Sequence, residues 1–361
     1  MSSWGSAVKI SIFGESHGKG IGVVIDGLPS GERLDIEKIY VQMARRAPGK
    51  DKTSTPRLEK DIPDIISGIL DDTTTGAPLC AVIGNTNTRS QDYGNVLSCP
   101  RPGHADFTGN IRYKGFNDIR GGGHFSGRLT APIVFAGAVC RQILERRGIR
   151  FAAHIASVGN IEDQRFDPVA IPGELVERLS LSTFGLIDQT KETAMRELIE
   201  ECRMSRDSIG GMVECAIVGV PAGAGSPMFD GIENVISSVV FGIPAVKGIE
   251  FGAGFEVSRM RGSQNNDEFY YDGETVKTRT NHHGGILGGI SSGMPIIFRV
   301  AFKPTPSISS EQSTVDLQKH ENAKLVINGR HDPCIVPRAV PVVEAAAAIA
   351  MVNILADVNK L

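Results

Sequence analysis

Hydrophobic and polar positions define short strand-like segments in both halves of the chain. Runs rich in Val and Ile, separated by turns that contain Gly, Pro or Asp, are typical of β-strands. They predict strands at residues 8–13, 22–25, 62–70, 79–83, 151–158, 212–218 and 295–302. The polar turn at residues 71–76 lies between two of these runs and indicates a hairpin.

Other segments have helical spacing. Asp35 is suited to cap a helix that runs to Arg46, and helices are also predicted near residues 189–204 and 232–240. Residues 133–140 and 342–357 are apolar on nearly every face. Helices of this kind are buried on both sides. We therefore expect an α+β fold, a β-α-β sandwich with apolar helices between two antiparallel sheets.

A glycine-rich run at residues 120–128 precedes one of the apolar helices. Thr130 is a candidate N-cap, and Gly148 is placed to end the helix. Arg128 then lies near a helix start, where free N–H groups and the positive end of the dipole favour an anion. The glycines would let a flat or phosphorylated ligand approach the backbone. The alternative is a surface loop that needs glycine only for its turns.

No linker or low-complexity tract interrupts the 361 residues, which predicts one domain over residues 1–361. The turn at residues 27–31, Gly-Leu-Pro-Ser-Gly, is echoed at residues 219–223 by Gly-Val-Pro-Ala-Gly. Each turn follows a predicted strand and precedes a predicted helix. The echo indicates two similar halves, and therefore an internal duplication.

Composition narrows the functional classes. The chain is 41% hydrophobic, and no apolar run is interpreted as long enough to span a bilayer, so no membrane is expected. A net charge of −3 excludes a generally basic surface for nucleic acid, so any anion site depends on individual arginines. The N-terminus lacks a signal-peptide pattern, and six scattered cysteines favour neither disulfides nor zinc. These features predict a cytoplasmic protein.

Two regions carry candidate chemistry. The proline-stiffened loop at residues 99–106 presents His104 as a candidate acid or base. A second glycine-rich run, residues 284–293, leads through a strand to Lys303 and is suited to phosphate, although it has no Walker spacing. The charged segment 50–60 predicts a mobile loop.

Six segments, in order along the chain, are similar to signature segments of one enzyme family: residues 14–18, 101–106, 121–130, 281–293, 303–305 and 330–333. With them, nearly the whole chain resembles the chorismate synthases. The resemblance implies conversion of 5-enolpyruvylshikimate 3-phosphate into chorismate and phosphate. This 1,4-elimination is the last common step of aromatic amino acid biosynthesis and needs reduced FMN without net redox change. The resemblance also implies a sandwich of helices between sheets and a homotetramer.

By this resemblance, three residues have catalytic roles. His17 attends the departing phosphate, His104 attends the flavin, and Asp332 helps to move the proton at the flavin N5. The substrate carries two carboxylates and a phosphate, which guanidinium groups bind in a bidentate manner. The arginines assigned to it are Arg46, Arg101, Arg128 and Arg330, with Arg45 and Arg338 in reserve.

The resemblance also implies the cofactor contacts. Those for FMN are His124, Phe125, Ser126, Pro244, Ala245, Gly288, Lys303, Pro304, Thr305, Pro306, Ser307 and Arg330. Family members that reduce their own flavin with NADPH have contacts that correspond to Arg46 and Lys52. This chain departs from one branch of the family at His124, where that branch has Arg, at Pro244, where it has Asn, and at Lys52, where it has Arg.

Two other functions fit part of the pattern. An FMN-binding module without turnover needs the glycine-rich loops, but not two histidines and an aspartate beside arginines. A phosphohydrolase of an anionic sugar would release phosphate without flavin. The source of reducing equivalents, NADPH or an outside reductant, stays open. The histidines at positions 282, 283 and 331 lack matching carboxylate spacing, so no metal site is predicted.

Overall fold

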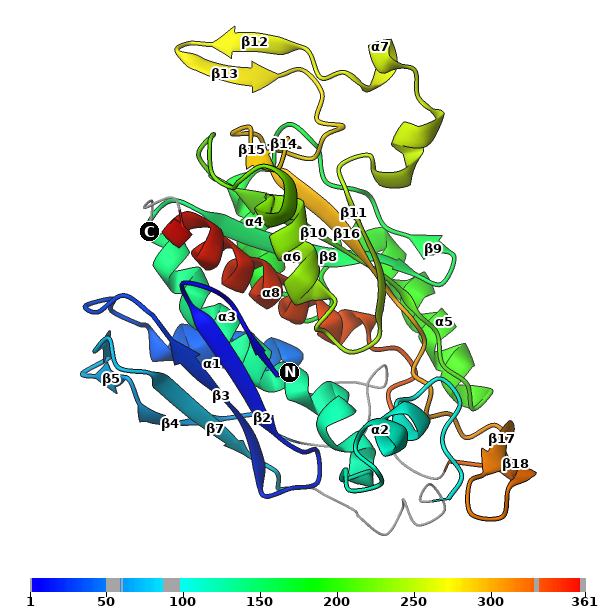
Figure 1. Ribbon diagram of the computed structural model, residues 1–361. Helices are drawn as coiled ribbons and strands as arrows, with labels where there is room; N and C mark the ends of the chain where they lie inside the picture. The colour runs from blue at the N-terminus through cyan, green and yellow to red at the C-terminus, as the bar shows by residue number, and fades with distance from the viewer. Residues whose placement is uncertain (1, 50–58, 60, 87–97, 328–330, 358–361) are drawn as a thin grey trace.

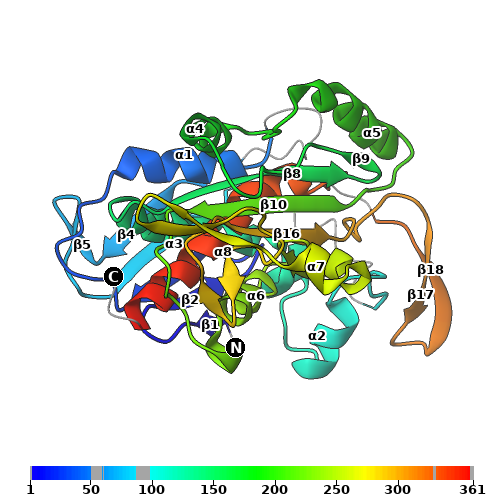
Figure 2. The ribbon, with the colours of Figure 1, turned by 90° about the horizontal axis from the view of Figure 1, so that it is seen from above.

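Two five-stranded antiparallel sheets enclose a layer of helices (Figure 1). The computed structural model describes residues 2–49, 59, 61–86, 98–327 and 331–357. Figure 2, seen from above, shows the central helices with strands on either side. The predicted α+β sandwich is confirmed.

The first sheet has the strand order β1-β2-β3-β7-β4. Its strands are β1 (Ser3–Trp4), β2 (Lys9–Gly14), β3 (Gly20–Asp26), β7 (Leu79–Gly84) and β4 (Pro63–Ser67). The predicted strand over residues 62–70 is wrong in its length. The chain breaks at Gly68, whose φ of 88° ends β4, and continues as β5 (Ile69–Leu70). β5 pairs with β6 (Thr73–Thr74) in a small hairpin around the predicted turn.

The second sheet has the strand order β11-β16-β10-β8-β9. Its strands are β11 (Val246–Phe251), β16 (Ile296–Phe302), β10 (Gly211–Val218), β8 (Arg150–Val158) and β9 (Ile161–Glu162). The central three agree with the predicted strands. Their continuous burial, in place of alternation, reflects cover on both faces.

The central layer contains α1 (Ile36–Arg46), α3 (Thr130–Glu145), α6 (Ile232–Val240) and α8 (Val336–Asp357). α3 packs closely on α8, since a Cβ added to Gly137 would lie 2.8 Å from the backbone carbon of Ala345. Asp35 caps α1 as predicted, by accepting a hydrogen bond from the backbone of Lys38. Gly148, with φ of 81°, follows the end of α3.

Two predicted helix boundaries are wrong. Thr130 is the first residue of α3, not its cap, and its hydroxyl donates to the carbonyl of Gly127 at 2.6 Å. α8 begins at Val336, six residues before the predicted start, and contains Pro341. A proline this close to the helix start removes only one early backbone hydrogen bond, so the helix tolerates it.

The prediction that no apolar run is long enough to span a bilayer is also wrong. Residues 336–356 of α8 form a helix that is long and apolar enough to do so, but 94% of its apolar window is buried inside the protein. A long apolar helix surrounded by other helices and two sheets has the surroundings of a core helix.

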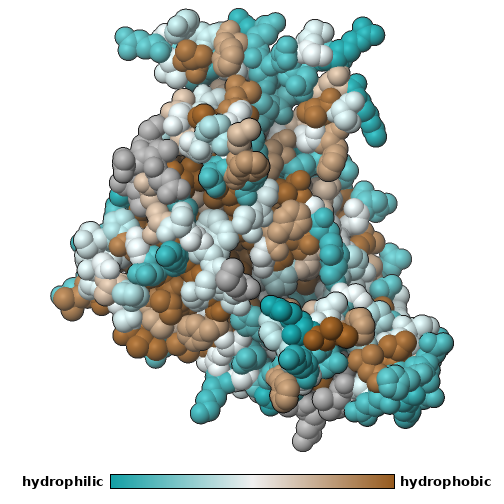
Figure 3. Space-filling view, in the orientation of Figure 1, coloured by the Kyte–Doolittle hydropathy of each residue, from teal (hydrophilic) through white to brown (hydrophobic). Residues whose placement is uncertain are grey.

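Smaller elements surround the sandwich. They are α2 (Asp106–Arg112), α4 (Gly173–Leu181), α5 (Glu192–Met204), α7 (Gly262–Asn265) and the hairpins β12–β13 (Phe269–Asp272, Thr275–Thr278), β14–β15 (Ile286–Leu287, Ile290–Ser291) and β17–β18 (Gln312–Asp316, Glu321–Leu325). The β12–β13 hairpin projects from the top of the molecule in Figure 1, and apolar colour appears there among hydrophilic residues in Figure 3.

The two sheets share a topology. In the first half, two strands, a helix and two strands give the order β2-β3-β7-β4, and α3 follows. In the second half, the order β8-β10-β16-β11 also comes from two strands, a helix (α6) and two strands, and α8 follows, but β9, α4 and α5 are inserted between β8 and β10. The echoed turns occupy matching places, and Gly27 and Gly219 have φ of 86° and 84°. The duplication itself stays a prediction.

Candidate active site

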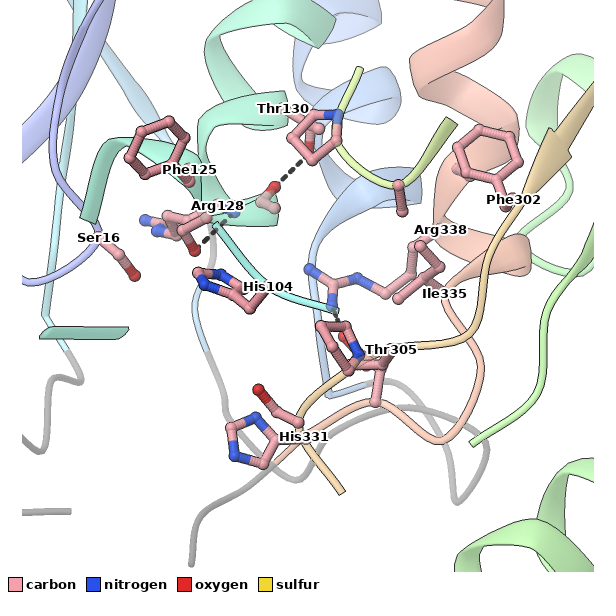
Figure 4. A pocket seen from close by; sticks show the side chains of 18 of the residues that line it. Ser16, His104, Phe125, Arg128, Thr130, Phe302, Thr305, His331, Ile335 and Arg338 are labelled. Carbon is pink, nitrogen blue, oxygen red and sulfur yellow. Dashed lines mark hydrogen bonds and ion pairs between the residues drawn. The ribbon is translucent and has the colours of Figure 1, made fainter. Parts of the chain in front are cut away.

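A cavity of about 440 Å³ lies where α3 and α8 begin (Figure 4). Its lining comes from both halves of the chain, including the ends of α1 and β16 and the segment that follows α6. In Figure 4, Ser16 and Arg128 lie on one side of His104, and Arg338 and Thr305 lie on the other. Its size is typical of a small-molecule site. Two helix starts at one cavity favour an anionic ligand.

His104 lines the cavity and belongs to a buried charged cluster. Its Nδ1 lies 2.6 Å from an oxygen of Asp106. The Arg101 guanidinium donates to both oxygens of the same carboxylate at 2.7 Å. Arg101 also donates to the Ser307 hydroxyl at 3.1 Å. The loop at residues 99–106 therefore holds an imidazole and a guanidinium on one carboxylate.

The glycine-rich run supports both predicted catalytic histidines. A Cβ added to Gly121 would lie 2.6 Å from Nε2 of His17, and one added to Gly122 would lie 3.0 Å from Nε2 of His104. Both glycines have positive φ, 61° and 87°. An imidazole ring therefore covers one face of each of these glycines, while Gly121 and Gly127 of the same run line the cavity. His17 itself lies behind Gly121, outside the cavity lining.

Arg46 and Arg128 meet on a carboxylate that the sequence analysis missed. Both form ion pairs with the fully buried Asp61, and Arg128 also lies 3.2 Å from Glu59. Burial opposes ionisation of Asp61, but the two arginines outweigh it and lower the pKa of Asp61. Burial lowers the pKa of Arg46 to about 10. In a segment of mixed charge, nothing in the sequence marked Asp61 as buried.

The opposite wall contains Pro244, Ala245, Lys303 and residues 305–307, and faces Phe125 and Ser126. The Lys303 ammonium donates to the carbonyl of Gly103 at 2.8 Å. Burial, with help from Lys247, lowers the pKa of Lys303. Within the described residues, the buried Thr305 hydroxyl has no hydrogen-bond partner. A cation, an unsatisfied hydroxyl and an aromatic ring fit the phosphate, hydroxyl and ring parts of FMN.

Asp332 lines the cavity and is ion-paired with Arg338. The Arg338 guanidinium also donates to the carbonyl of Arg46 at 3.0 Å. This hydrogen bond connects the start of α8 with the end of α1. The other reserve residue, Arg45, lies outside the cavity lining and is ion-paired with buried Glu344. Its guanidinium is thus held in a buried ion pair away from the cavity lining.

Other predicted contacts lie elsewhere. The His124 ring is outside the cavity lining, 2.6 Å from the Ser2 hydroxyl and 2.8 Å from the carbonyl of Gly14. Gly288 lies in the turn between β14 and β15, and Pro304 is next to lining residues without being one. Lys52, Arg330 and most of the predicted mobile loop, residues 50–58 and 60, are outside the described residues.

Asp267 holds two of the other histidines. Nδ1 of His282 and Nδ1 of His283 lie 3.1 Å and 2.9 Å from its carboxylate oxygens. In the part of the chain that the structure describes, no group of three or more His, Cys, Asp or Glu residues is arranged to hold a metal ion.

Comparison with known proteins identifies the family. A family model described as chorismate synthase matches residues 8–356. A chorismate synthase of Dehalococcoides mccartyi is 47% identical over 98% of this chain and 96% of its own length. One of Lachnoclostridium phytofermentans is 48% identical over 98% and 95%. A crystal structure of chorismate synthase superposes with a TM-score of 0.77, at 29% identity over 98% of this chain and 93% of that one. The chain belongs to the chorismate synthase family.

Proposed function

We propose that the cavity at the starts of α3 and α8 is the active site at which this carbon–oxygen lyase converts 5-enolpyruvylshikimate 3-phosphate into chorismate. The observation that carries this assignment is the meeting of His104, four arginines and Lys303 around one cavity. Neither half of the chain supplies all of these groups. The whole chain, residues 1–361, therefore acts as one catalytic domain, which the large core cluster with members from Val8 to Leu355 also supports.

The arginines bind the anionic substrate. Arg46 and Arg128 are held side by side by Asp61 before any ligand arrives, so little side-chain ordering is left for binding. Arg101 presents its remaining N–H groups beside Ser307. By the family resemblance, Arg330 completes this set.

FMN is assigned to the wall formed by Lys303, residues 305–307, Pro244 and Ala245, opposite Phe125 and Ser126. Reduced FMN, when bound, supplies the electron density that helps to expel phosphate. Lys303 pairs with its phosphate group, and Thr305 gains a hydrogen-bond partner. His124, Gly288 and Pro304 remain proposals from the resemblance alone.

The proton-carrying groups are His104 and Asp332, which line the cavity, and His17, which lies beside the lining residue Gly121. His104 presents Nε2 beside Gly122, and His17 presents Nε2 beside Gly121. An imidazolium at either place stabilises negative charge on the departing phosphate or on the flavin. Asp332, held by Arg338, accepts or returns a proton at its carboxylate.

The wider setting is also proposed. The enzyme acts in the cytoplasm as a homotetramer, without nucleic acid or membrane, and exposed apolar side chains on the projecting β12–β13 hairpin support association of copies. NADPH is the proposed reductant if the enzyme reduces its own flavin, with contacts from Arg46 and Lys52. Loss of NADPH absorbance in the presence of FMN, without another reductase, would support this.

The activity is tested anaerobically. The protein is mixed with 5-enolpyruvylshikimate 3-phosphate and with reduced or oxidised FMN, and chorismate absorbance and phosphate are followed together. We expect equal amounts of both products, and only with reduced FMN. Phosphate without chorismate would indicate a phosphohydrolase. Flavin binding without either product would indicate a passive FMN module.

A further inference from the structure

Asp106 is the first residue of α2 and lies directly behind the cavity wall. Its carboxylate is buried and does not line the cavity. It accepts hydrogen bonds from the Arg101 backbone at 3.0 Å, from two nitrogens of the Arg101 guanidinium at 2.7 Å, and from the His104 ring. One carboxylate therefore fixes two groups that do line the cavity.

The short contact between Asp106 and His104 determines the tautomer of the ring. Burial opposes ionisation of Asp106, but hydrogen bonds from Arg101 and His104 outweigh it and hold the pKa of Asp106 well below its usual range. Nδ1 of His104 lies 2.6 Å from the ionised carboxylate. Nη2 of Arg101, which can only donate, also lies 3.1 Å from Nδ1 and 3.5 Å from Nε2. The carboxylate contact is the shorter one, and a bare nitrogen lone pair would be repelled by the carboxylate at that distance, so Nδ1 carries the proton and donates it to Asp106.

Because Nδ1 donates its proton to Asp106, Nε2 is the ring atom that is available for proton exchange. It lies over Gly122, and a Cβ at that position would be 3.0 Å away. Gly122 has φ of 87°, so glycine is favoured there for the backbone as well as for the space. The His104 ring thus contacts the Asp106 carboxylate through Nδ1 and lies against the backbone of Gly122 through Nε2.

We propose that Asp106 is a positioning residue for the elimination, because it holds the cavity-lining ring of His104 in one orientation and one tautomer and orients Arg101 through the same carboxylate. The proposal rests on the proposed function of the cavity. It predicts that loss of the carboxylate lowers kcat because His104 is no longer held in place. This loss is separate from any weakening of substrate binding by Arg101.

The kinetic test uses D106N, H104A and the double variant. In D106N we expect kcat to fall about 100-fold, the size of effect associated with a displaced acid or base, and KM to rise by a smaller factor. In the H104A background, D106N should lower kcat by less than about threefold, because the group it positions is already absent. D106E should recover part of kcat. An equal loss of kcat from D106N in both backgrounds would overturn the proposal.

A second readout does not depend on activity. In deuterated protein with ¹⁵N-labelled histidine, the His104 signals are assigned by their absence in H104A. The wild type should show a protonated Nδ1, and D106N should show a mixture of tautomers. An unchanged His104 pattern in D106N would overturn the proposal even if the wild type failed to make chorismate.

D163N is the matched control, because Asp163 holds another buried histidine, His154, at 2.8 Å outside the cavity. It should lose stability and keep both kcat and the His104 signals. If D163N changed the His104 signals as D106N does, the tautomer shift would reflect general loosening and the proposal would fail.

Discussion

His154 is fully buried between two carboxylates in the second sheet. Its Nδ1 lies 2.8 Å from Asp163 and its Nε2 lies 3.0 Å from Glu214. Burial opposes the charged ring, but the two carboxylates outweigh it and raise the pKa of His154. This histidine was unremarkable in the sequence, because Glu214 reaches it through the pairing of β10 with β8, and Asp163 reaches it from the end of β9.

The raised pKa predicts a pH-dependent stability. The stabilisation is fully present below the unfolded value, about 6.5, and is lost as the pH rises through the higher folded value. Urea midpoints measured from about pH 6 to about pH 9 should therefore fall more steeply for the wild type than for H154Q. Parallel curves for the two proteins would contradict this account.

Lys303 gives a prediction for the cofactor wall. K303M keeps most of the side-chain volume but removes the cation proposed to pair with the FMN phosphate. We expect FMN affinity, measured by flavin fluorescence, to fall at least about tenfold, because a charge-assisted hydrogen bond contributes about 1.5–3 kcal/mol. K247M is the control, since Lys247 is exposed and outside the cavity lining. A similar loss in both variants would argue against a specific role.

At the scale of elements, local patterns predicted most of the fold. The central strands lie where runs rich in Val and Ile placed them, and both apolar helices form, although each starts earlier than predicted. The errors lie where one residue was read by its local preference alone. Pro341 was taken to precede a helix but lies inside α8, and Gly68 was taken as part of one strand but divides it in two. The sequence offered no means of finding Asp61, because its burial depends on two arginines from α1 and the start of α3.

The site was predictable only in part for the same reason. Motifs identified His104 and the arginines, but a side chain's direction depends on neighbours that are distant in the sequence. His124 illustrates this, since Ser2 and the carbonyl of Gly14 hold its ring outside the cavity lining. The positions of Lys52 and Arg330 stay predictions.

The contact between α3 and α8 predicts a large effect of one methyl group. In G137A, the added Cβ would overlap Ala345. Overpacking of a core costs about 1–3 kcal/mol, which outweighs the better helix propensity of alanine, so the free energy of unfolding in urea should fall. G262A is the control, because no atom lies within 4 Å of its new Cβ. Equal stability of G137A and the wild type would contradict this packing.

At the scale of the molecule, the β12–β13 hairpin is the clearest candidate for a contact between copies. Register and alternation place Phe269, Tyr271 and Val276 on one face of the hairpin, and all three are exposed. An apolar face that projects from the body is typical of an association surface.

Assembly can therefore be tested with the double variant F269S/Y271S. Because neither side chain belongs to the core, the variant should keep its thermal unfolding temperature. Light scattering should show fewer copies per particle than the wild type, for which the proposed tetramer has four chains of 38.6 kDa. An unchanged particle mass would remove the hairpin from the interface.

The close crossing of α3 and α8 also determines the position of the start of α3. Thr130 begins α3 seven residues before Gly137, a distance of about 10 Å along the helix axis at 1.5 Å per residue. A tilt of about 5° at the crossing would move that helix start, and Arg128 beside it, by about 1 Å. Displacements of this size alter reaction rates as much as about 100-fold. Two small residues in the core thus set the width of an active site that neither of them touches.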